Sequence, residues 1–376
     1  MPADITNLVV EPLDGSTVVV GVPYRLRAEA VQANGELFDA TDKVDWGATS
    51  TGDYDIAADG LTITFKADAS ESVTLTATPN DDSFGEYATP ATSTVTVLKP
   101  EVQGIIVTPP DVTLAEKEVI QLRAYEYYTY GKPLDVTSAA VWSVEGTGDG
   151  DLGVTVSDDG LVTSLNQGGT VNITAKKEGN EGSTLVFILE ACGSGEADLD
   201  NINDTDATNA IGACLKIASD SSGNWFTSTP SQALMDAMGY KEDDSSINSG
   251  DTYSVASSDA IGGNFAEFRQ DGIDVILPGA GGDSPGVNGQ FDRWCQRLAL
   301  LGFADRSDWH RPLAKELTVL HGDVGSLSSG FGWPTGSASF SATEDGEGYV
   351  SVFLDGGTES TRPASYQDYA SCISSP

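Results

Sequence analysis

Short stretches of alternating apolar and polar residues fill the first 190 positions of the chain. STVTVL at 93–98 and STLVFIL at 183–189 are two of them, and turns rich in Gly, Asp and Pro separate such stretches. Because side chains of a strand point alternately to its two faces, a period of two predicts strands with one buried face. We find no convincing helical period in this half, and we therefore expect it to be all β.

The pattern of this half occurs twice, at an offset of about 96 residues, which is close to the length of one small β-sandwich. The matching pairs are VVEP (9–12) with IVTP (106–109), RLRAEA (25–30) with QLRAYE (121–126), DATDKVDW (39–46) with DVTSAAVW (135–142), and ADGLTITF (58–65) with DDGLVTSL (158–165). The repeat predicts two sandwich domains, 1–99 and 100–190. Trp46 and Trp142 occupy equivalent positions, where we expect a core Trp between two sheets.

Helical patterns appear after residue 190. Thr229-Pro230-Ser231-Gln232 reads as a helix start with Thr229 as the cap, and Gly239 is positioned to end that helix. We expect further helices at 291–301 and 312–320, the second with Asp308 or Ser307 as its cap and Trp309 packed beneath it. Tyr349–Leu354 alternates as a strand. Short helices mixed with strands predict an α+β domain over 191–376.

The charge of the chain limits its partners. Its 376 residues include 57 Asp and Glu against 19 Lys and Arg, a net charge of −38. Such a field repels phosphates and excludes nucleic acids and anionic membrane surfaces as expected partners. We find no apolar run near the roughly 20 residues of a membrane helix, so we expect no membrane insertion. The opening MPADITNLVV lacks the features of a signal peptide, and we expect the sequence to be a piece of a longer protein.

The four cysteines all lie in the second half of the chain. An even number in an acidic chain rich in Gly and Ser indicates two disulfides and an oxidising compartment. Cys295 falls on the buried side of its helix, and a bond to Cys372 would tie the end of the chain to that helix. Cys192 would then pair with Cys214. Four free thiols and a zinc site are the alternatives, although no pair has CxxC spacing.

The repeated units resemble bacterial immunoglobulin-like domains, through their D-x-T-x-x-x-x-W and D-G-L stretches. The end of the chain is similar to the C-type-lectin-like domains that end intimin- and invasin-family adhesins. The residues that carry this likeness are Cys295, GFADRSDWHRPLAKEL (302–317), GWPT (332–335), SFSAT (339–343), YVSVFLDGG (349–357) and Cys372. In the family an Arg usually follows the Trp directly, and a Tyr-Trp pair stands where this chain has Ser339-Phe340. These departures put any specific receptor in doubt.

The resemblance implies a multidomain protein in which two all-β immunoglobulin-like sandwiches are followed by an α+β C-type-lectin-like domain. It implies an adhesin fragment at a bacterial cell surface, anchored in the outer membrane by parts outside this sequence. The lectin-like tip would bind a protein or glycan of a host or neighbouring cell, and the sandwiches would act as spacers. We expect a monomeric fragment with no enzymatic activity and no required cofactor. The candidate contact residues are Trp333, Tyr349, Phe353, Arg362, Tyr366 and Tyr369.

Other interpretations concern different residues. A phage or virus receptor-binding protein combines the same modules, and a calcium-dependent lectin is a further alternative. DLDNINDTD (198–206) could hold a structural Ca²⁺ through Asp198, Asp200, Asp204 and Asp206, or form a solvated Asx-rich turn. GDSPG (282–286) matches G-x-S-x-G around Ser284, with His310 or His321 as the base, but Pro and Gly after the serine favour a loop.

Overall fold

The computed structural model describes residues 5–13, 15–49, 53–67, 69–80, 84, 86–87, 89–146, 153–165, 168–193, 202–272, 288–346 and 348–376. The chain divides into two compact units, one of residues 1–105 with 125–135 and the other of residues 106–124 with 136–376. This division does not test domain boundaries at 99 and 190, which stay a prediction. Within the described ranges, no helix combines the length and apolar character needed to cross a lipid bilayer.

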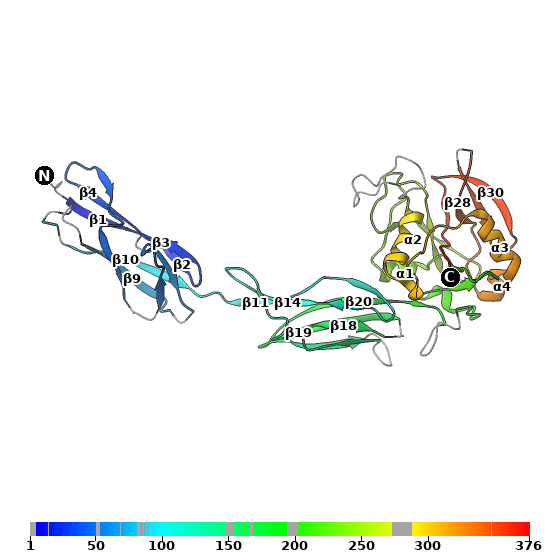
Figure 1. Cartoon of the computed structure of the whole chain (residues 1–376), viewed down its shortest axis with the longest axis horizontal. Helices are drawn as coiled ribbons and strands as arrows, with labels where there is room; N and C mark the ends of the chain where they lie inside the picture. The colour runs from blue at the N-terminus through cyan, green and yellow to red at the C-terminus, as the bar shows by residue number, and fades with distance from the viewer. Residues whose placement is uncertain are drawn as a thin grey trace. The chain divides into compact units, whose positions relative to one another are not determined.

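The first ten strands form three small sheets (Figure 1), and their buried apolar side chains form two clusters. The strands are β1 Ile5–Glu11, β2 Thr17–Val19, β3 Pro23–Arg25, β4 Arg27–Gln32, β5 Leu37–Asp39, β6 Val44–Ala48, β7 Tyr54–Ile56, β8 Thr62–Phe65, β9 Ser72–Pro79 and β10 Ala91–Leu98. Their sheet orders are β1-β4-β5, β2-β10-β9-β6 and β3-β8-β7. Trp46 packs against both apolar clusters of this domain, so it lies in the core as expected.

The next ten strands repeat this topology strand for strand. They are β11 Val102–Thr108, β12 Val112–Ala115, β13 Val119–Gln121, β14 Arg123–Tyr128, β15 Leu134–Asp135, β16 Val141–Gly146, β17 Val154–Val156, β18 Leu161–Ser164, β19 Gly169–Lys177 and β20 Asn180–Ala191. Their orders are β11-β14-β15, β12-β20-β19-β16 and β13-β18-β17. Even a side-chain bond recurs, because the indole of Trp46 donates to Thr41 O at 3.3 Å and that of Trp142 to Thr137 O at 2.9 Å. The repeat found in the sequence is therefore also a repeat of the structure.

The rest of the chain forms a terminal domain in which helices pack beside a six-stranded sheet (Figure 1). Its strands are β21 Cys214–Leu215, β22 Ile217–Ser219, β23 Trp225–Thr227, β24 Lys241–Glu242, β25 Thr252–Tyr253, β26 Val255–Ser258, β27 Asn264–Phe268, β28 Ser339–Asp345, β29 Gly348–Phe353, β30 Thr358–Pro363, β31 Asp368–Tyr369 and β32 Ile373–Ser374. The large sheet has the order β26-β27-β31-β28-β29-β30, and β22-β23-β32 form a smaller one. The last strand thus pairs with one of the first.

The helices of this domain are α1 Gln232–Ala237, α2 Gln290–Leu300, α3 Ala314–Val324 and α4 Leu327–Phe331, with 3-10 turns at Asn209–Ile211 (η3) and Phe303–Asp305 (η4). Two of the helices, α1 and α3, begin later than the sequence predicts, and α2 begins one residue earlier. Ser231, rather than Thr229, caps α1, since its hydroxyl accepts from Leu234 N at 3.0 Å. Thr229 instead donates to Ala266 O of β27 at 2.7 Å. The prediction of Thr229 as the cap was wrong, because its hydroxyl is hydrogen-bonded to strand β27.

The start of α3 shifts for a similar reason. Pro312 O accepts from Ala342 N of β28 at 2.7 Å, so Pro312 belongs to the sheet side of the turn, and the Glu316 carboxylate accepts from Leu313 N at 2.7 Å. Asp308, one of the predicted caps, accepts instead from Ser375 N at 3.0 Å. Trp309 is buried and donates to Phe303 O at 2.8 Å. It packs in the apolar cluster that contains Cys295 and Leu298 of α2, whereas the buried residues of α3 belong to another cluster.

Strand β20 continues from the second sandwich into the terminal domain. Glu190 and Ala191 at its end pair in parallel with Cys214 and Leu215 of β21. Phe187, Leu189 and Ala191 belong to the same apolar cluster as residues of α1 and α2. The second sandwich and the terminal domain therefore share part of one core, and experiments on the terminal domain are best made on the whole chain.

Candidate binding site

Three of the candidate contact residues lie in the core of the terminal domain. Trp333 is fully buried, Tyr349 is 5% exposed and Tyr369 is 2% exposed. Trp333 packs in the cluster beneath α3 and α4, and the Tyr369 hydroxyl donates to Asp259 Oδ2 at 3.0 Å. Side chains that water does not reach cannot contact a partner without a rearrangement. These three residues therefore lie outside the contact surface proposed below.

The other candidates lie at or near the surface. The guanidinium of Arg362 on β30 lies over the ring of Tyr366, with Cζ 4.4 Å from the ring centroid. Tyr366 is 42% exposed, whereas Arg362 and Phe353 are half-buried. A cation stacked on a tyrosine is already ordered, so less side-chain entropy would be lost when a partner binds it. Arg362 and Tyr366 together form the stacked pair, which is the part of the predicted site that remains available.

A buried carboxyl group lies on β31, the strand that follows this pair along the chain. Asp368 on β31 is 1% exposed, and it accepts from Ser351 Oγ at 2.7 Å and from Ser337 Oγ at 3.2 Å. Burial raises the pKa of Asp368 from 3.8 to about 6, against the opposing effects of the Ser351 hydroxyl and the Arg362 charge. The proton on Asp368 is therefore held more tightly in the folded chain than in the unfolded chain.

This carboxyl group predicts a measurable pH dependence of stability. Because the folded pKa lies above the unfolded one, the Asp368 contribution to the free energy of unfolding falls as pH rises from 3.8 to about 6. Asp368→Asn cannot ionise, so we expect it to be more stable than the wild type at neutral pH by about 2 kcal/mol. Urea unfolding should show this gain shrinking by about 1 kcal/mol at pH 5. A gain that does not change with pH would contradict the buried-acid explanation.

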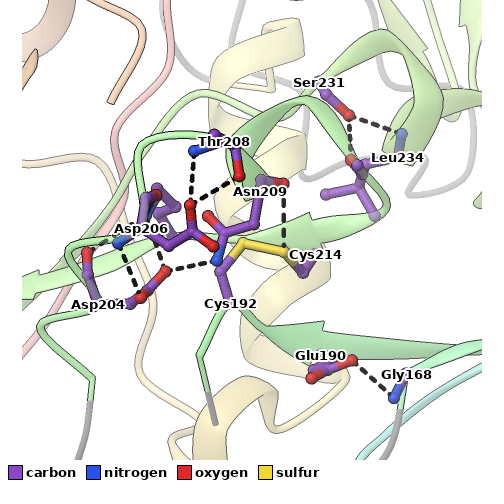
Figure 2. Close-up of a disulfide and its surroundings, with 12 residues drawn as sticks. Gly168, Glu190, Cys192, Asp204, Asp206, Thr208, Asn209, Cys214, Ser231 and Leu234 are labelled. Atoms are coloured by element: carbon purple, nitrogen blue, oxygen red, sulfur yellow. Dashed lines mark hydrogen bonds and ion pairs between the residues drawn. A yellow bond between two sulfur atoms is a disulfide. The ribbon is translucent and has the colours of Figure 1, made fainter. Parts of the chain in front are cut away.

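Both disulfides of the described chain join segments that are distant in sequence. Cys192, just after β20, is bonded to Cys214 on β21, and Figure 2 shows this bond at the end of the second sandwich. Cys295 on α2 is bonded to Cys372 just before β32. These are the pairs predicted from the sequence. Beside the first bond, the Glu190 carboxylate accepts from Gly168 N at 2.8 Å, and burial raises the pKa of Glu190.

Two of the predicted metal ligands surround an ammonium group of the chain itself. Lys216 has a fully buried side chain, and its Nζ donates to Asp204 Oδ2 at 2.8 Å, to Asp204 O at 3.2 Å and to Asp206 O at 2.7 Å. Figure 2 shows the turn that carries Asp204 and Asp206. Asp198 and Asp200 lie outside the described residues. Among the residues that are described, no group of three or more acidic, His or Cys side chains could hold a metal ion.

Hydrogen bonds to the Asp204 carboxylate offset the cost of its burial. Burial raises the pKa of Asp204, but the hydrogen bonds from Lys216 Nζ, Asn209 Nδ2 and Asp206 N together lower it by more than burial raises it. The pKa of Asp204 therefore lies below its ordinary value. Oxygens that would attract Ca²⁺ are thus already engaged by a positive charge. The sequence signal for this buried ion pair was Lys216, a charged residue within the mostly apolar run ACLKIAS (213–219), which we did not use in predicting the site.

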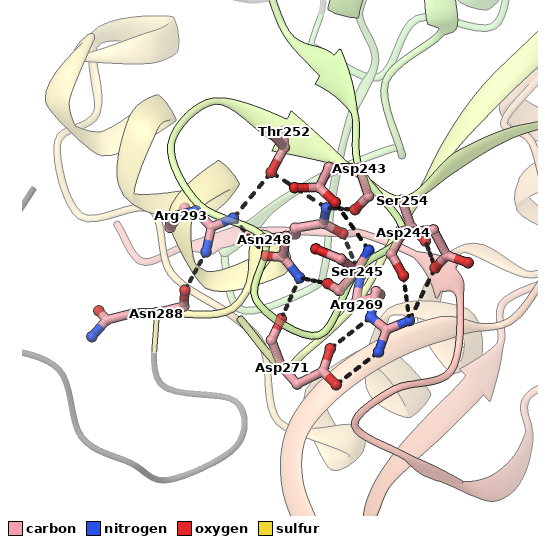
Figure 3. A network of polar contacts seen from close by, with 11 residues as sticks. Asp243, Asp244, Ser245, Asn248, Thr252, Ser254, Arg269, Asp271, Asn288 and Arg293 are labelled. Atoms are coloured by element: carbon pink, nitrogen blue, oxygen red, sulfur yellow. Dashed lines mark hydrogen bonds and ion pairs between the residues drawn. The ribbon is translucent and has the colours of Figure 1, made fainter. Parts of the chain in front are cut away.

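Two buried arginines organise a polar network in the terminal domain (Figure 3). Arg269 binds both carboxylate oxygens of Asp271, at 2.7 and 2.8 Å, and donates to Asp244 Oδ1 at 3.0 Å. Arg293 on α2 donates to Asn248 Oδ1 at 2.8 Å and to the carbonyl of Asn288. Because each guanidinium offers five N–H groups in a fixed plane, two side chains can hold several loop segments. The network is structural.

The residues of the hydrolase interpretation are only partly described. Ser284 lies outside the described residues. His310 Nδ1 lies 2.7 Å from Asp308 O, and His321 Nδ1 lies 3.0 Å from Leu354 O. Each histidine thus has a backbone partner that explains its position, and the expectation that the protein is not an enzyme stays a prediction.

Comparisons with known proteins give the general kind of protein and no family. No family model matches the chain. Ice-binding protein 1 of Shewanella frigidimarina (strain NCIMB 400) is 28% identical over 187 residues, which are 50% of this chain and 20% of that protein. The chain thus spans about a fifth of the length of the curated relative that it matches. Its similarity to that relative is confined to half of the chain.

Solved structures that align with the chain are built of β domains. The S-layer protein rSbsC matches at 15% identity and a TM-score of 0.30, over 61% of this chain and 31% of that one. Titin domains z1z2 match at 14% identity and a TM-score of 0.27, over 49% of this chain and 96% of that one. Mouse cadherin-23 matches at 15% identity and a TM-score of 0.22, over 48% and 63%. Scores of this size carry no argument about function.

Proposed function

We propose that the chain is the exported end of a bacterial surface adhesin. In this proposal, two immunoglobulin-like sandwiches act as spacers, and a C-type-lectin-like terminal domain binds a protein or glycan on a host or neighbouring cell. The full protein would be anchored in the outer membrane by segments outside this sequence. The observation that carries the proposal is the order of its parts, in which two topologically identical sandwiches lead into one disulfide-bonded α+β domain.

Several features support an extracellular setting. Two disulfides persist only in an oxidising compartment, and a charge of −38 keeps a protein soluble and away from anionic surfaces. The bond between Cys295 on helix α2 and Cys372 supports the proposal, because the lectin-like resemblance includes a cysteine on a helix and a last cysteine. The name of the Shewanella relative refers to ice, but the match covers a fifth of that protein, so ice binding is not part of the proposal.

The proposed contact surface is the stacked pair, with Phe353 as a further candidate on β29. Aromatic and Arg side chains contribute most to protein interfaces. We propose that binding is independent of calcium, because the Asp204 and Asp206 oxygens already hold Lys216. A calcium-dependent lectin and a phage or virus receptor-binding protein are the alternatives that the binding experiment separates by ligand and by metal dependence.

The test is a binding screen with the whole chain, made on arrays of glycans and surface proteins and on bacterial and animal cells. Arg362→Ala with Tyr366→Ala should weaken the binding found there by about tenfold, because the stacked pair is lost. Lys132→Ala with Tyr130→Ala is a matched control outside the terminal domain, where Tyr130 is 48% exposed. We expect binding to survive a calcium chelator. Loss of binding with chelator would favour a calcium-dependent lectin, and equal loss in both double variants would contradict the proposed surface.

A further inference from the structure

An open groove lies between helix α3 and the strands β28 to β30, which run side by side in Figure 1. Its volume is about 1050 Å³. The helix contributes Lys315, Thr318, Val319, Gly322 and Asp323. These positions follow the pattern i, i+3, i+4, i+7 and i+8, so they form one face of α3. The strands contribute Ala342, Thr343, Glu344, Val350 and Glu359.

This groove is distinct from the stacked pair. Val350 pairs with Thr361 across β29 and β30, while Tyr349 pairs with Arg362. Since neighbouring residues of a strand point to opposite faces, Val350 and Arg362 lie on opposite faces of the sheet. Glu344 at the end of β28 pairs with Tyr349 and so belongs to the face of Arg362, whereas Glu359 pairs with Val352 on the groove face. A ligand seated against Val350 and Glu359 would therefore leave Arg362 and Tyr366 untouched, and the groove goes beyond the function proposed above.

The floor of the groove is apolar although water reaches it. Leu313 is 50% exposed and Val319 is 38% exposed, and half-buried Ala342 and Val350 lie across from them. The opposite face of α3 already buries Leu317 and Leu320 in the core. The helix therefore carries apolar residues on both faces, and an apolar face in a concave surface is typical of a binding site.

The rim of the groove is mainly acidic. Asp323, Glu344 and Glu359 supply three carboxylates, and Lys315 is the one cation among the lining residues. Asp323 accepts from Ser221 N, and Glu359 accepts from Thr318 Oγ1 at 3.2 Å. A partner must therefore match apolar contacts in the middle with positive charge at the edge. A phosphate-bearing ligand would be repelled, and a sugar would find few polar groups on the floor.

Gly322 keeps the middle of the groove open. A Cβ atom placed at Gly322 would meet no atom within 4 Å, and the backbone there is helical. Any larger residue would be accepted by the helix, and most would favour it, because Gly is a poor helix former. The absence of a side chain at this position therefore leaves space in the groove at some cost in helix stability.

We propose that this groove binds an extended or helical segment of a partner protein. The segment would place apolar side chains between Leu313, Val319 and Val350, and its flanking Lys or Arg side chains would reach Asp323 and Glu359. The occupant is identified by charge complementarity with the rim. The same chemistry excludes acidic segments, which would meet three carboxylates.

The test uses short random peptides displayed on phage and selected against the whole chain. Selected peptides should carry an apolar pair flanked by Lys or Arg. A synthetic copy of the best peptide should bind Gly322→Leu about tenfold more weakly than the wild type, as measured by fluorescence anisotropy, because the leucine fills the groove. Gly330→Leu is the matched control, since Gly330 on α4 is also helical, meets no atom within 4 Å and does not line the groove.

Each result decides one proposal. Selected peptides without basic residues, no selected peptides, or equal binding by Gly322→Leu would overturn the groove proposal. Melting temperatures of both variants show whether they fold, and we expect neither to fall. If the wild type binds cells through Arg362 and Tyr366 while peptide selection fails, the adhesin proposal stands and the groove proposal falls. If selection succeeds and no cell or array is bound, the reverse holds.

Discussion

Replacing Cys295 and Cys372 with alanine is expected to lower the free energy of unfolding by about 4–5 kcal/mol. The bond joins residues 77 positions apart, so its loss gives the unfolded chain much more conformational freedom. It also connects α2 to the segment that precedes the last strand, β32. Both cysteines are fully buried in the apolar cluster that contains Trp294 and Phe291. The variant should therefore lose its terminal domain first when urea is added.

The matched control for this variant is Cys192→Ala with Cys214→Ala. That bond spans 22 positions, and the same reasoning gives a loss of about 3 kcal/mol. Urea unfolding followed by tryptophan fluorescence measures both, since Trp294 and Trp309 are buried in the terminal domain. A larger loss from the control pair than from Cys295 and Cys372 would contradict the chain-entropy explanation.

The sandwiches could be predicted from the sequence because their information is local and repeated. The alternation of apolar and polar residues shows which face of a strand is exposed, whichever strand it pairs with. A pattern that occurs twice supports the same interpretation twice. The matching orders β1-β4-β5 and β11-β14-β15 confirm the repeat. The bonds from Trp46 to Thr41 O and from Trp142 to Thr137 O show why each repeat keeps a tryptophan after its D-x-T stretch.

The binding residues could not be predicted as well, because composition does not tell which face of a central strand is covered. Strand β29 lies between β28 and β30, and α3 packs against its Val352. Its other face carries Tyr349 and Ser351, which are also buried. With both faces covered in the middle of the strand, Tyr349 on β29 is a core residue. The groove was missed for a related reason, since Leu313 fits the apolar period of α3 and yet lies at its exposed edge.

Lys216→Met is expected to lower the free energy of unfolding by about 3–5 kcal/mol. Methionine fills a similar volume, but it leaves the Asp204 carboxylate, whose side chain is 9% exposed, without its positive partner. It also removes the donor that Asp204 O and Asp206 O share. Leaving one charge of a buried pair uncompensated costs far more than the pair itself contributes.

The double variant Lys216→Met with Asp204→Asn separates these effects. If an unpaired charge causes the loss, the double variant should recover about half of it, because asparagine is neutral and can still accept from Asp206 N.

The pH dependence of the Lys216→Met deficit is a second test of this explanation. The pKa of Asp204 is lowered in the folded chain, so the ion pair stabilises the wild type above pH 3.8 and less as pH falls. Urea unfolding at pH 7 and pH 3 should show the Lys216→Met deficit shrinking at the lower pH, because the wild type loses the contribution of the ion pair only below pH 3.8. A deficit equal at both pH values, with no recovery in the double variant, would mean that Lys216 acts by packing alone.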